Sequence, residues 1–337
     1  MNRSVFFALF SLCLFFSCEN PSKLDKEHNI DTKDWMADVF GENQNLKLND
    51  IAIPGTYYSL TYQITPDSPY ATDSISEWTL SVQKEVGREV LAAFSMNQNL
   101  DVKEQLRQGI RYFDFRLESY ESTIFSFHNF LSSEIEPVLD EFSHFAANHP
   151  KEIVFIDLKK VNVEPPLYGE LLQLIIDRLG RHIVQVSDIN PDSTVKNLWN
   201  KGVSVVLLSS YPPQTLRQEK MIFNRDNWFT EVIPTYQTTD SIFNALTTSL
   251  KTKDSVRMAI LGIVQHPSAL TLLSSVSGSP QSIYEMCTQK DSPNAMFKNW
   301  FINLDTQIKK NGNIFLFNQF QTNPENITEI IKYNKNL

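Results

Sequence analysis

Cysteine is scarce in this sequence: its 337 residues contain only Cys13, Cys18 and Cys287. The first two lie in a segment with the composition of an export signal, so Cys287 is the one thiol left in the body of the chain and an internal disulfide is excluded. There is no GxGxxG, Walker, HExxH or CxxC motif, and Ser59 and Ser126 lack the local signature of a nucleophile elbow. The usual signatures of dinucleotide, nucleotide and zinc-protease sites are therefore missing.

Clustered positive charge is missing as well. The chain has 30 Lys and Arg against 39 Asp and Glu, a formal net charge of −9, and the basic residues are dispersed. This distribution argues against nucleic-acid binding and against a polybasic membrane patch. No internal repeat or low-complexity tract is present, and 42% of the residues are hydrophobic. Such a chain can bury a sizeable core, either as one large α/β barrel or as two ordinary domains.

The N-terminus is typical of a targeting segment. The apolar run Val5–Phe16 is too short to span a bilayer with margin, and it is followed by Ser17 and Cys18. This arrangement resembles a bacterial lipoprotein signal, in which a small residue precedes a cysteine that becomes lipidated, although Phe15 stands where leucine is usual. The alternative is an ordinary secretory signal in which Cys18 is incidental. We expect an extracytoplasmic protein that a lipid on Cys18 anchors to a bacterial membrane.

Strand-like and helix-like segments alternate along the rest of the chain, which favours a mainly parallel sheet. Seven apolar segments are expected to be strands: Leu48–Ile53, Tyr112–Leu117, Ile124–Phe127, Ile153–Leu158, Val203–Leu208, Met258–Val264 and Ile314–Phe317. A sixth barrel strand is expected near Trp228–Tyr236, where the pattern is poor. Helices are expected at Ser81–Ala93, Ile135–Asn148, Leu167–Leu179 and Thr194–Asn200. We divide the chain into a signal peptide at 1–18, a tether and N-terminal segment at 19–45, and one α/β domain at 46–337.

Polar residues at the ends of predicted strands suit phosphate-ester chemistry. The first strand ends in a turn at Pro54-Gly55-Thr56 that presents the next side chain to a cleft. Asp114 and Arg116 point the same way, because they are two residues apart on a strand. His128 follows another apolar strand at its C-terminal end. The residue presented by the turn is Tyr57, however, and a phenol with an ordinary pKa of about 10 is a poor general base at neutral pH.

These residues lie in long, ordered segments that resemble one family. The segments are IPGTYYS (53–59), MNQNLDVKEQLRQGIRYFDFRLE (96–118), FSFHNFL (125–131) and NHPKEIVFIDLKK (148–160), with weaker similarity at 198–212, 258–269 and the C-terminus. From about Leu46 to Tyr333 the chain resembles the X domain of phosphatidylinositol-specific phospholipase C, in particular its stand-alone type. The resemblance implies a distorted TIM-type (β/α)8 barrel in a single domain. It also implies attack of an inositol hydroxyl on the neighbouring phosphodiester, with release of diacylglycerol.

The resemblance implies roles for several side chains. His128 matches the general acid, and Arg116 matches the arginine that contacts phosphate in metal-free members, where a guanidinium fork suits two phosphodiester oxygens. Asp114 would orient that cation, and the alternative is a buried Asp–Arg pair that only holds the barrel together. Lys159, next to Lys160, is a further candidate for binding the substrate. Calcium-dependent relatives have a carboxylate at the position of Arg116, so we expect no metal and no other cofactor.

Four positions depart from the family pattern. Tyr57 stands in place of the general-base histidine, and Tyr58 in place of the aspartate that follows it. Asn318 matches an acidic residue that supports the base, and the arginine expected to hold the sugar is replaced by Ser209 or Ser210. Aromatic faces and hydroxyls can bind a sugar or a lipid headgroup without proton transfer. The sequence therefore indicates a binding cleft with incomplete catalytic machinery.

Three functions stay open at this point. The first is a surface lipoprotein with weak or lost inositol-phospholipid cleavage that binds a phosphoinositide, another phosphodiester or a sugar headgroup. The second is an active, metal-independent phosphoric diester hydrolase of lipid metabolism with a substitute base. His266, which follows the strand Met258–Val264, is the candidate base, and the alternative is a polar loop residue beside Pro267. The third is a non-catalytic surface binding or adhesion lipoprotein. In each case the anchor is the membrane contact and no nucleic-acid partner is expected.

Overall fold

The computed structural model describes residues 31–72, 77–235, 238–253 and 256–337. The predicted signal peptide, with Cys18, and residues 19–30 of the predicted tether lie outside the described residues. A compact unit begins at Asp31 and runs to Leu337. Residues 31–45, which we assigned to the N-terminal segment, are therefore part of the folded unit.

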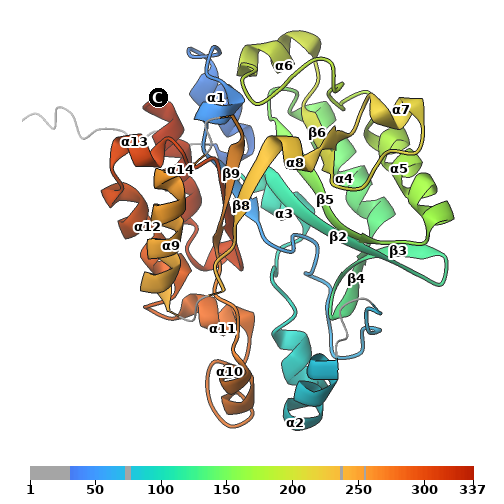
Figure 1. Cartoon of the computed structure of the whole chain (residues 1–337), viewed down its shortest axis with the longest axis vertical. Coiled ribbons are helices and arrows are strands. Elements are labelled where there is room, and N and C mark those ends of the chain that lie inside the picture. The colour runs from blue at the N-terminus through green and yellow to red at the C-terminus, as the bar shows by residue number, and fades with distance from the viewer. Residues whose placement is uncertain (1–30, 73–76, 236–237, 254–255) are drawn as a thin grey trace, which may run out of the picture. The chain divides into compact units, whose positions relative to one another are not determined.

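Eight parallel strands form a curled sheet whose order is β7-β6-β5-β2-β1-β10-β9-β8 (Figure 1). They are β1 (Ile53–Thr56), β2 (Tyr112–Tyr120), β5 (Val154–Asn162), β6 (Val205–Ser209), β7 (Phe223–Asn224), β8 (Phe229–Val232), β9 (Met258–Ile263) and β10 (Ile314–Phe317). Most of their residues are buried, as expected for strands covered on both faces. The strands β7 and β8 stand at the two ends of the order, so the barrel is open between them. The predicted α/β class is confirmed, and β8 lies where the sixth barrel strand was expected.

A hairpin extends from one edge of this sheet. The strand β3 (Thr123–His128) pairs antiparallel with β2, and β4 (Phe130–Glu134) pairs antiparallel with β3. The prediction that His128 ends a parallel barrel strand is therefore wrong, because a tight turn at Glu121 and Ser122, both with positive φ, reverses the chain after β2. His128 reaches the carboxyl end of the barrel from the hairpin instead.

The helices and short 3-10 turns surround the sheet (Figure 1). They are η1 (Thr32–Asp34), α1 (Trp35–Phe40), η2 (Leu48–Asp50), α2 (Glu77–Ala93), α3 (Val102–Arg107), α4 (Ile135–Asn148), α5 (Pro165–Leu179), α6 (Val195–Lys201), α7 (Leu216–Glu219), α8 (Arg225–Trp228), α9 (Thr239–Lys251), α10 (Ala269–Ser274), α11 (Ile283–Thr288), α12 (Pro293–Asn303), α13 (Thr306–Lys309), η3 (Phe320–Thr322) and α14 (Glu325–Lys335). The predicted first strand at Leu48–Ile53 is displaced, since its first half is η2 and β1 starts at Ile53. Among the described helices, none is long and apolar enough to cross a bilayer.

Two long excursions at the carboxyl ends of the strands pack against each other. The first follows β1 and contains α2, which has a non-helical break at Gly87, where φ is 84°. The second follows β9 and contains α10 and α11, and α2 contacts α10 (Figure 1). A buried apolar cluster joins the two excursions: Val86, Phe94, Leu272, Ile283, Met286 and Cys287. We call the end of the barrel at which the parallel strands have their carboxyl ends the mouth. The helices of the two excursions form one wall beside it.

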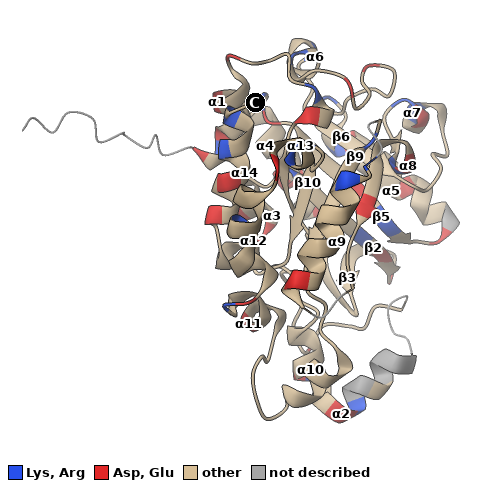
Figure 2. Ribbon diagram, turned by 60° about the vertical axis from the view of Figure 1, so that its left-hand side comes forward, with Lys and Arg blue, Asp and Glu red and all other residues tan. Residues whose placement is uncertain are grey.

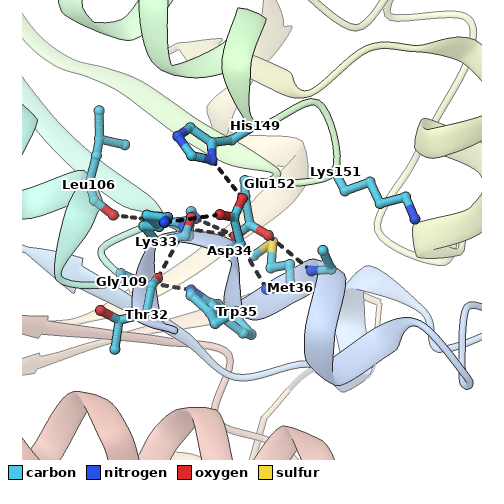
Figure 3. Close-up of polar contacts among 12 residues, drawn as sticks. Thr32, Lys33, Asp34, Trp35, Met36, Leu106, Gly109, His149, Lys151 and Glu152 are labelled. Carbon is cyan, nitrogen blue, oxygen red and sulfur yellow. Dashed lines mark hydrogen bonds and ion pairs between the residues drawn. The ribbon is translucent and has the colours of Figure 1, made fainter. Parts of the chain in front are cut away.

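The N-terminal segment packs at the end of the barrel away from α2 and α10 (Figure 1), and Figure 3 shows polar contacts that hold it. The fully buried Arg111 donates to Glu152 at 2.7 Å and 3.0 Å and to the carbonyl of Lys33 at 2.6 Å. Glu152 also accepts from the backbone N–H groups of Met36 and Ala37, at 3.2 Å and 2.9 Å. Arg111 directly precedes β2 and Glu152 lies two residues before β5. This network therefore ties the segment to the amino ends of two central strands, where barrel residues serve stability rather than chemistry.

Charged side chains of both signs are spread over the helices, and Figure 2 shows no stripe of one sign in that view. The excursion that contains α10 differs from the other helices in its composition. It has no Asp, Glu, Lys or Arg between Met258 and Tyr284. In Figure 2 the helix α10 is therefore tan, the colour of residues other than Lys, Arg, Asp and Glu. The mouth of the barrel is therefore bordered on one side by a neutral protrusion.

Candidate functional site at the mouth of the barrel

The turn after β1 places two tyrosines side by side at the mouth. The buried Ser59 hydroxyl accepts from the backbone N–H of Asp114 at 2.8 Å and donates to the carbonyl of Thr56 at 3.0 Å. This ties the turn to β2. Tyr58 has a φ of 48°, which is uncommon for a bulky residue, so the surrounding hydrogen bonds hold a strained backbone here. The rings of Tyr57 and Tyr58 meet edge to face at 4.8 Å.

Behind the tyrosines lies the predicted Asp–Arg pair. Arg116 donates to both carboxylate oxygens of the fully buried Asp114, at 3.0 Å and 3.1 Å, and Lys159 Nζ lies 3.6 Å from the same carboxylate. Burial alone would raise the pKa of Asp114, but the charges of Arg116 and Lys159 hold it below its ordinary value. The guanidinium fork that a phosphate would need is thus occupied by the carboxylate of Asp114.

Tyr58 separates the cation from the histidine. The guanidinium carbon of Arg116 is 3.5 Å from the centre of the Tyr58 ring, and the His128 ring stacks on Tyr58 with centroids 4.0 Å apart. Two groups at these distances would collide on one face of a six-membered ring, so they lie on opposite faces. Arg116 and His128 are brought to the same mouth, as the resemblance implied, but an aromatic ring fills the space between them.

The tautomer of His128 follows from its hydrogen bond to Ser95. Its Nδ1 lies 2.9 Å from the carbonyl oxygen of Ser95, so Nδ1 carries the proton and Nε2 is left as an acceptor. Burial, together with the nearby charge of Arg116, lowers the pKa of His128 to about 3. At pH 7 only about one molecule in 10⁴ carries the imidazolium that a general acid requires. In this state His128 can accept a hydrogen bond but is a poor proton donor.

His128 should give the fold a measurable pH dependence. Its pKa of about 3 in the folded chain is below the ordinary value of about 6.5, so as the pH falls the unfolded chain takes up this proton first and stability is lost below about pH 6.5. Between pH 7 and pH 5 this group should remove about 2 kcal/mol from the free energy of unfolding. Urea unfolding of the unmodified chain and of His128→Gln at both values measures the difference.

Asp157, whose pKa burial raises to about 6, acts in the opposite direction as the pH falls, but it does so in both proteins and cancels in the comparison. The His128→Gln chain should therefore lose about 2 kcal/mol less than the unmodified chain on going to pH 5. Equal losses would show that the imidazole is not held in its neutral form.

A deeper charge network, which the sequence analysis missed, fills the barrel below the mouth. Lys159 pairs with Glu231 of β8, and Arg225 of α8 pairs with Glu231 at 3.1 Å and with Asp157 of β5 at 2.6 Å. Tyr112 donates to the same Asp157 carboxylate. With Asp114 and Arg116, three cations and three carboxyl groups in the barrel interior are linked in one chain of ion pairs.

One signal in the sequence could have found part of this network. Asp157 and Lys159 repeat the two-residue spacing of Asp114 and Arg116, and Asp114 and Asp157 are register partners on neighbouring strands. Residues two apart on a strand share a face, so Asp157 belonged on the inward face with Lys159. Glu231 carried no such signal, because β8 has only four residues and no clear alternation.

A cavity of about 230 Å³ opens at the mouth in front of the tyrosines. Its wall is made by Tyr57, Tyr58, Leu91, Phe94, Asn97, His128, Asn129, Gln265, His266, Pro267, Leu272, Ile283 and Asn318. It brings together five residues considered from the sequence: Tyr57, Tyr58, His128, His266 and Asn318. Asp114, Arg116 and Lys159 do not line it, because the tyrosine rings cover Arg116 at 3.5 Å and Lys159 at 5.5 Å. Lys160 points elsewhere, over the ring of Phe127.

The remaining predicted positions have structural partners. Asn318 is buried and its Oδ1 accepts from Asn97 Nδ2 at 2.9 Å. Ser209, at the end of β6, is buried and accepts from the backbone N–H of Tyr211 at 3.0 Å, whereas Ser210 is exposed. His266 lies edge to face with Tyr57, with ring centroids 5.9 Å apart. His266 lies in the loop between β9 and α10, beside Pro267, and its ring lines the cavity.

No family model matches the chain. Human PI-PLC X domain-containing protein 2 is 28% identical over 198 residues, which are 57% of this chain and 65% of that protein. Human PI-PLC X domain-containing protein 3 is 24% identical over 194 residues, 55% of this chain and 60% of that protein. Human PI-PLC X domain-containing protein 1 is 27% identical over 184 residues, with 52% and 56% covered. The chain thus matches less than two thirds of the length of these relatives.

Solved structures show the same fold. The phosphatidylinositol-specific phospholipase C of Listeria monocytogenes superposes with a TM-score of 0.60 at 19% identity, covering 90% of this chain and 98% of that one. The corresponding enzyme of S. aureus gives a TM-score of 0.60 at 16% identity, with 90% and 97% covered. At these identities the likeness establishes the barrel alone. Together with the similarity to the curated PI-PLC X domain-containing proteins, it supports a phospholipase C-like X-domain barrel for this chain.

Proposed function

We propose that this chain is a phospholipase C-like barrel protein in which inositol-phospholipid cleavage is weak or lost, while the mouth is kept as a site for a phosphate- or sugar-bearing headgroup. The observation that carries this proposal is the Tyr58 ring, which lies between His128 and Arg116. In the family reaction the acid and the cation act on one phosphodiester, so both must touch it at once. Here the two groups touch opposite faces of a side chain instead.

Neither tyrosine supports the missing base function. Burial raises the pKa of Tyr57 above its ordinary value, and burial raises that of Tyr58 to about 12, even though Arg116 acts in the opposite direction on both. Both phenols are therefore neutral at pH 7 and can donate hydrogen bonds but not accept a proton. The test is cleavage of phosphatidylinositol, other phosphoinositides and glycerophosphodiesters by the purified chain. Efficient turnover that His128→Ala abolishes would overturn the proposal.

A second candidate is an active diester hydrolase in which His266 is the substitute base. Two observations favour it: His266 lines the cavity beside Tyr57, and its Nε2 has no hydrogen-bond partner. Burial lowers the pKa of His266, so the ring is neutral and able to take a proton at pH 7. If the panel shows cleavage, His266→Gln should remove it, whereas His144→Gln on the outer surface of α4 should leave it unchanged.

Any cleavage should be independent of added metal. Among the described residues, no three His, Cys, Asp or Glu side chains gather in a group that could hold a metal ion. Calcium requires six to eight oxygen ligands, and Arg116 already occupies both oxygens of Asp114. Turnover measured with and without EDTA should therefore agree within twofold. A loss of activity on chelation that calcium restores would contradict this expectation.

We also propose that Cys18 carries the lipid that anchors the protein on the extracytoplasmic side of a bacterial membrane. The proposal rests on the apolar run, the Ser17-Cys18 junction and the polar segment that follows. Mass spectrometry of the mature protein tests it, because cleavage before Cys18 and a diacylglyceryl adduct on its sulfur are expected. A free thiol at Cys18, or cleavage elsewhere, would indicate an ordinary secretory signal.

A further inference from the structure

The cavity at the mouth differs in chemistry from the charged barrel beneath it. We propose that it takes an uncharged, polyhydroxylated ring with an apolar substituent, in preference to a phosphodiester. This inference rests on the proposed function, which leaves a binding site at the mouth, and it narrows the ligand of that site to one chemical class.

The first support is the neutral wall. Among the described residues that line the cavity, none is Asp, Glu, Lys or Arg. His128 and His266 are neutral at pH 7, because burial lowers the pKa of both. The nearest cations, Arg116 and Lys159, lie behind the tyrosine rings and are paired with carboxylates. A phosphate brought into this space would lose its hydration without meeting an ion partner, and this is a large penalty for a charge.

The second support is the set of hydrogen-bonding atoms along the wall. His128 Nε2 is an acceptor, because Nδ1 donates to Ser95. Asn97 is only 3% exposed, and its Oδ1 has no partner although its Nδ2 donates to Asn318. A buried carbonyl without a donor is unfavourable, and a ligand hydroxyl can supply the missing donor. Phosphodiester oxygens only accept hydrogen bonds and cannot satisfy these acceptors, whereas ring hydroxyls both donate and accept.

The third support is the apolar side of the cavity. Leu91 and Phe94 come from the end of α2 and the residue that follows it, Leu272 comes from α10, and Ile283 from α11. The same α10 also exposes Leu270, at 75%, within a stretch that carries no charge. A single ring can therefore stack on the aromatic side while its substituent contacts the helices. The volume of about 230 Å³ is below the range of about 300–1,000 Å³ typical of drug-sized sites, so one ring fits but an oligosaccharide does not.

Calorimetric titration of the purified full chain tests the proposal. The probes are myo-inositol, methyl and octyl glucoside below its micelle-forming concentration, and inositol 1-phosphate, each at 50 and 500 mM NaCl. The neutral probes should bind with affinities that salt does not change, and octyl glucoside should bind more tightly than methyl glucoside, by about fourfold for each methylene that becomes buried. Inositol 1-phosphate should bind no more tightly than myo-inositol. These measurements use the unmodified chain and do not depend on the folding of a variant.

A matched pair of variants tests the role of Asn97 Oδ1, the buried acceptor that has no partner. Asn97→Ala should weaken the neutral probes by about three- to tenfold, the range expected for one lost hydrogen bond. Asn303→Ala, at an exposed position at the end of α12, should change nothing. Tighter binding of inositol 1-phosphate that falls steeply with salt would overturn the inference, as would the absence of binding by every neutral probe. Efficient phosphatidylinositol cleavage is a separate outcome, which would overturn the proposed loss of catalysis and not the preference for neutral ligands.

Discussion

Replacing Tyr57 with histidine and Tyr58 with aspartate is expected to raise phosphatidylinositol cleavage by about 10²–10⁴-fold, the usual contribution of a positioned general base. Two effects combine. Histidine restores a group that can take the proton of the inositol hydroxyl, and loss of the Tyr58 ring opens the space between His128 and Arg116. The measurement is release of water-soluble inositol phosphate from vesicles. Adding Asn318→Asp should raise the rate further, since a carboxylate there would orient the new imidazole.

The single changes separate these two effects. Tyr57→His alone supplies the base but leaves the ring between acid and cation, and Tyr58→Asp alone opens the space without a base, so each should give much less than the double change. Tyr284→His on the exposed end of α11 controls for an added imidazole elsewhere. In the double variant, His128→Gln should remove the gain. A folded double variant with unmodified activity would show that the turn after β1 does not correspond to the catalytic turn of the family.

Elements with a strong local pattern could be predicted from the sequence. The helix α4 has the predicted bounds, Ile135–Asn148, because its apolar face repeats with helical spacing and Pro150 follows it. The strands β9 and β10 are likewise continuous apolar runs. The two-residue strand β7 could not be found, since two residues show no periodicity. The strand β1 is displaced because Leu48 and Ile51 are buried by packing outside the sheet and not by strand pairing.

The sequence predicted which residues belong to the candidate site but not how they are arranged in it. Five of the proposed residues line one cavity, since the segments that carry them end at the same mouth. The stacking of Tyr58 between His128 and Arg116 depends on a positive φ and on a hairpin that reverses the chain, and neither follows from residue type. The partners of Lys159 were also hidden, because Glu231 lies 72 residues away on a short strand. Contacts through space between distant segments are what sequence spacing does not contain.

Removing one partner of the buried Arg111–Glu152 pair is expected to lower the free energy of unfolding by about 3–5 kcal/mol. Both side chains are fully buried, so Arg111→Met leaves the carboxylate of Glu152 in the interior without its cation. Glu152→Gln leaves the guanidinium unpaired and weakens acceptance from the backbone of Met36 and Ala37. Urea unfolding at pH 7 measures the loss, and the N-terminal segment should become accessible to protease first, because its carbonyl at Lys33 also depends on Arg111.

Two controls decide whether charge burial is the cause. The Arg107–Glu104 pair on α3 is exposed, and Arg107→Met should change the free energy of unfolding by less than about 1 kcal/mol. Replacing both buried partners together, as Arg111→Met with Glu152→Leu, removes both charges and should recover much of the loss seen in the single variants, since apolar replacement of a buried pair is often neutral. Single variants as stable as the unmodified chain would mean that the N-terminal segment is not held by this pair. A double variant less stable than either single variant would assign its role to the hydrogen bonds that Arg111 makes with Lys33, Leu106 and Ile110.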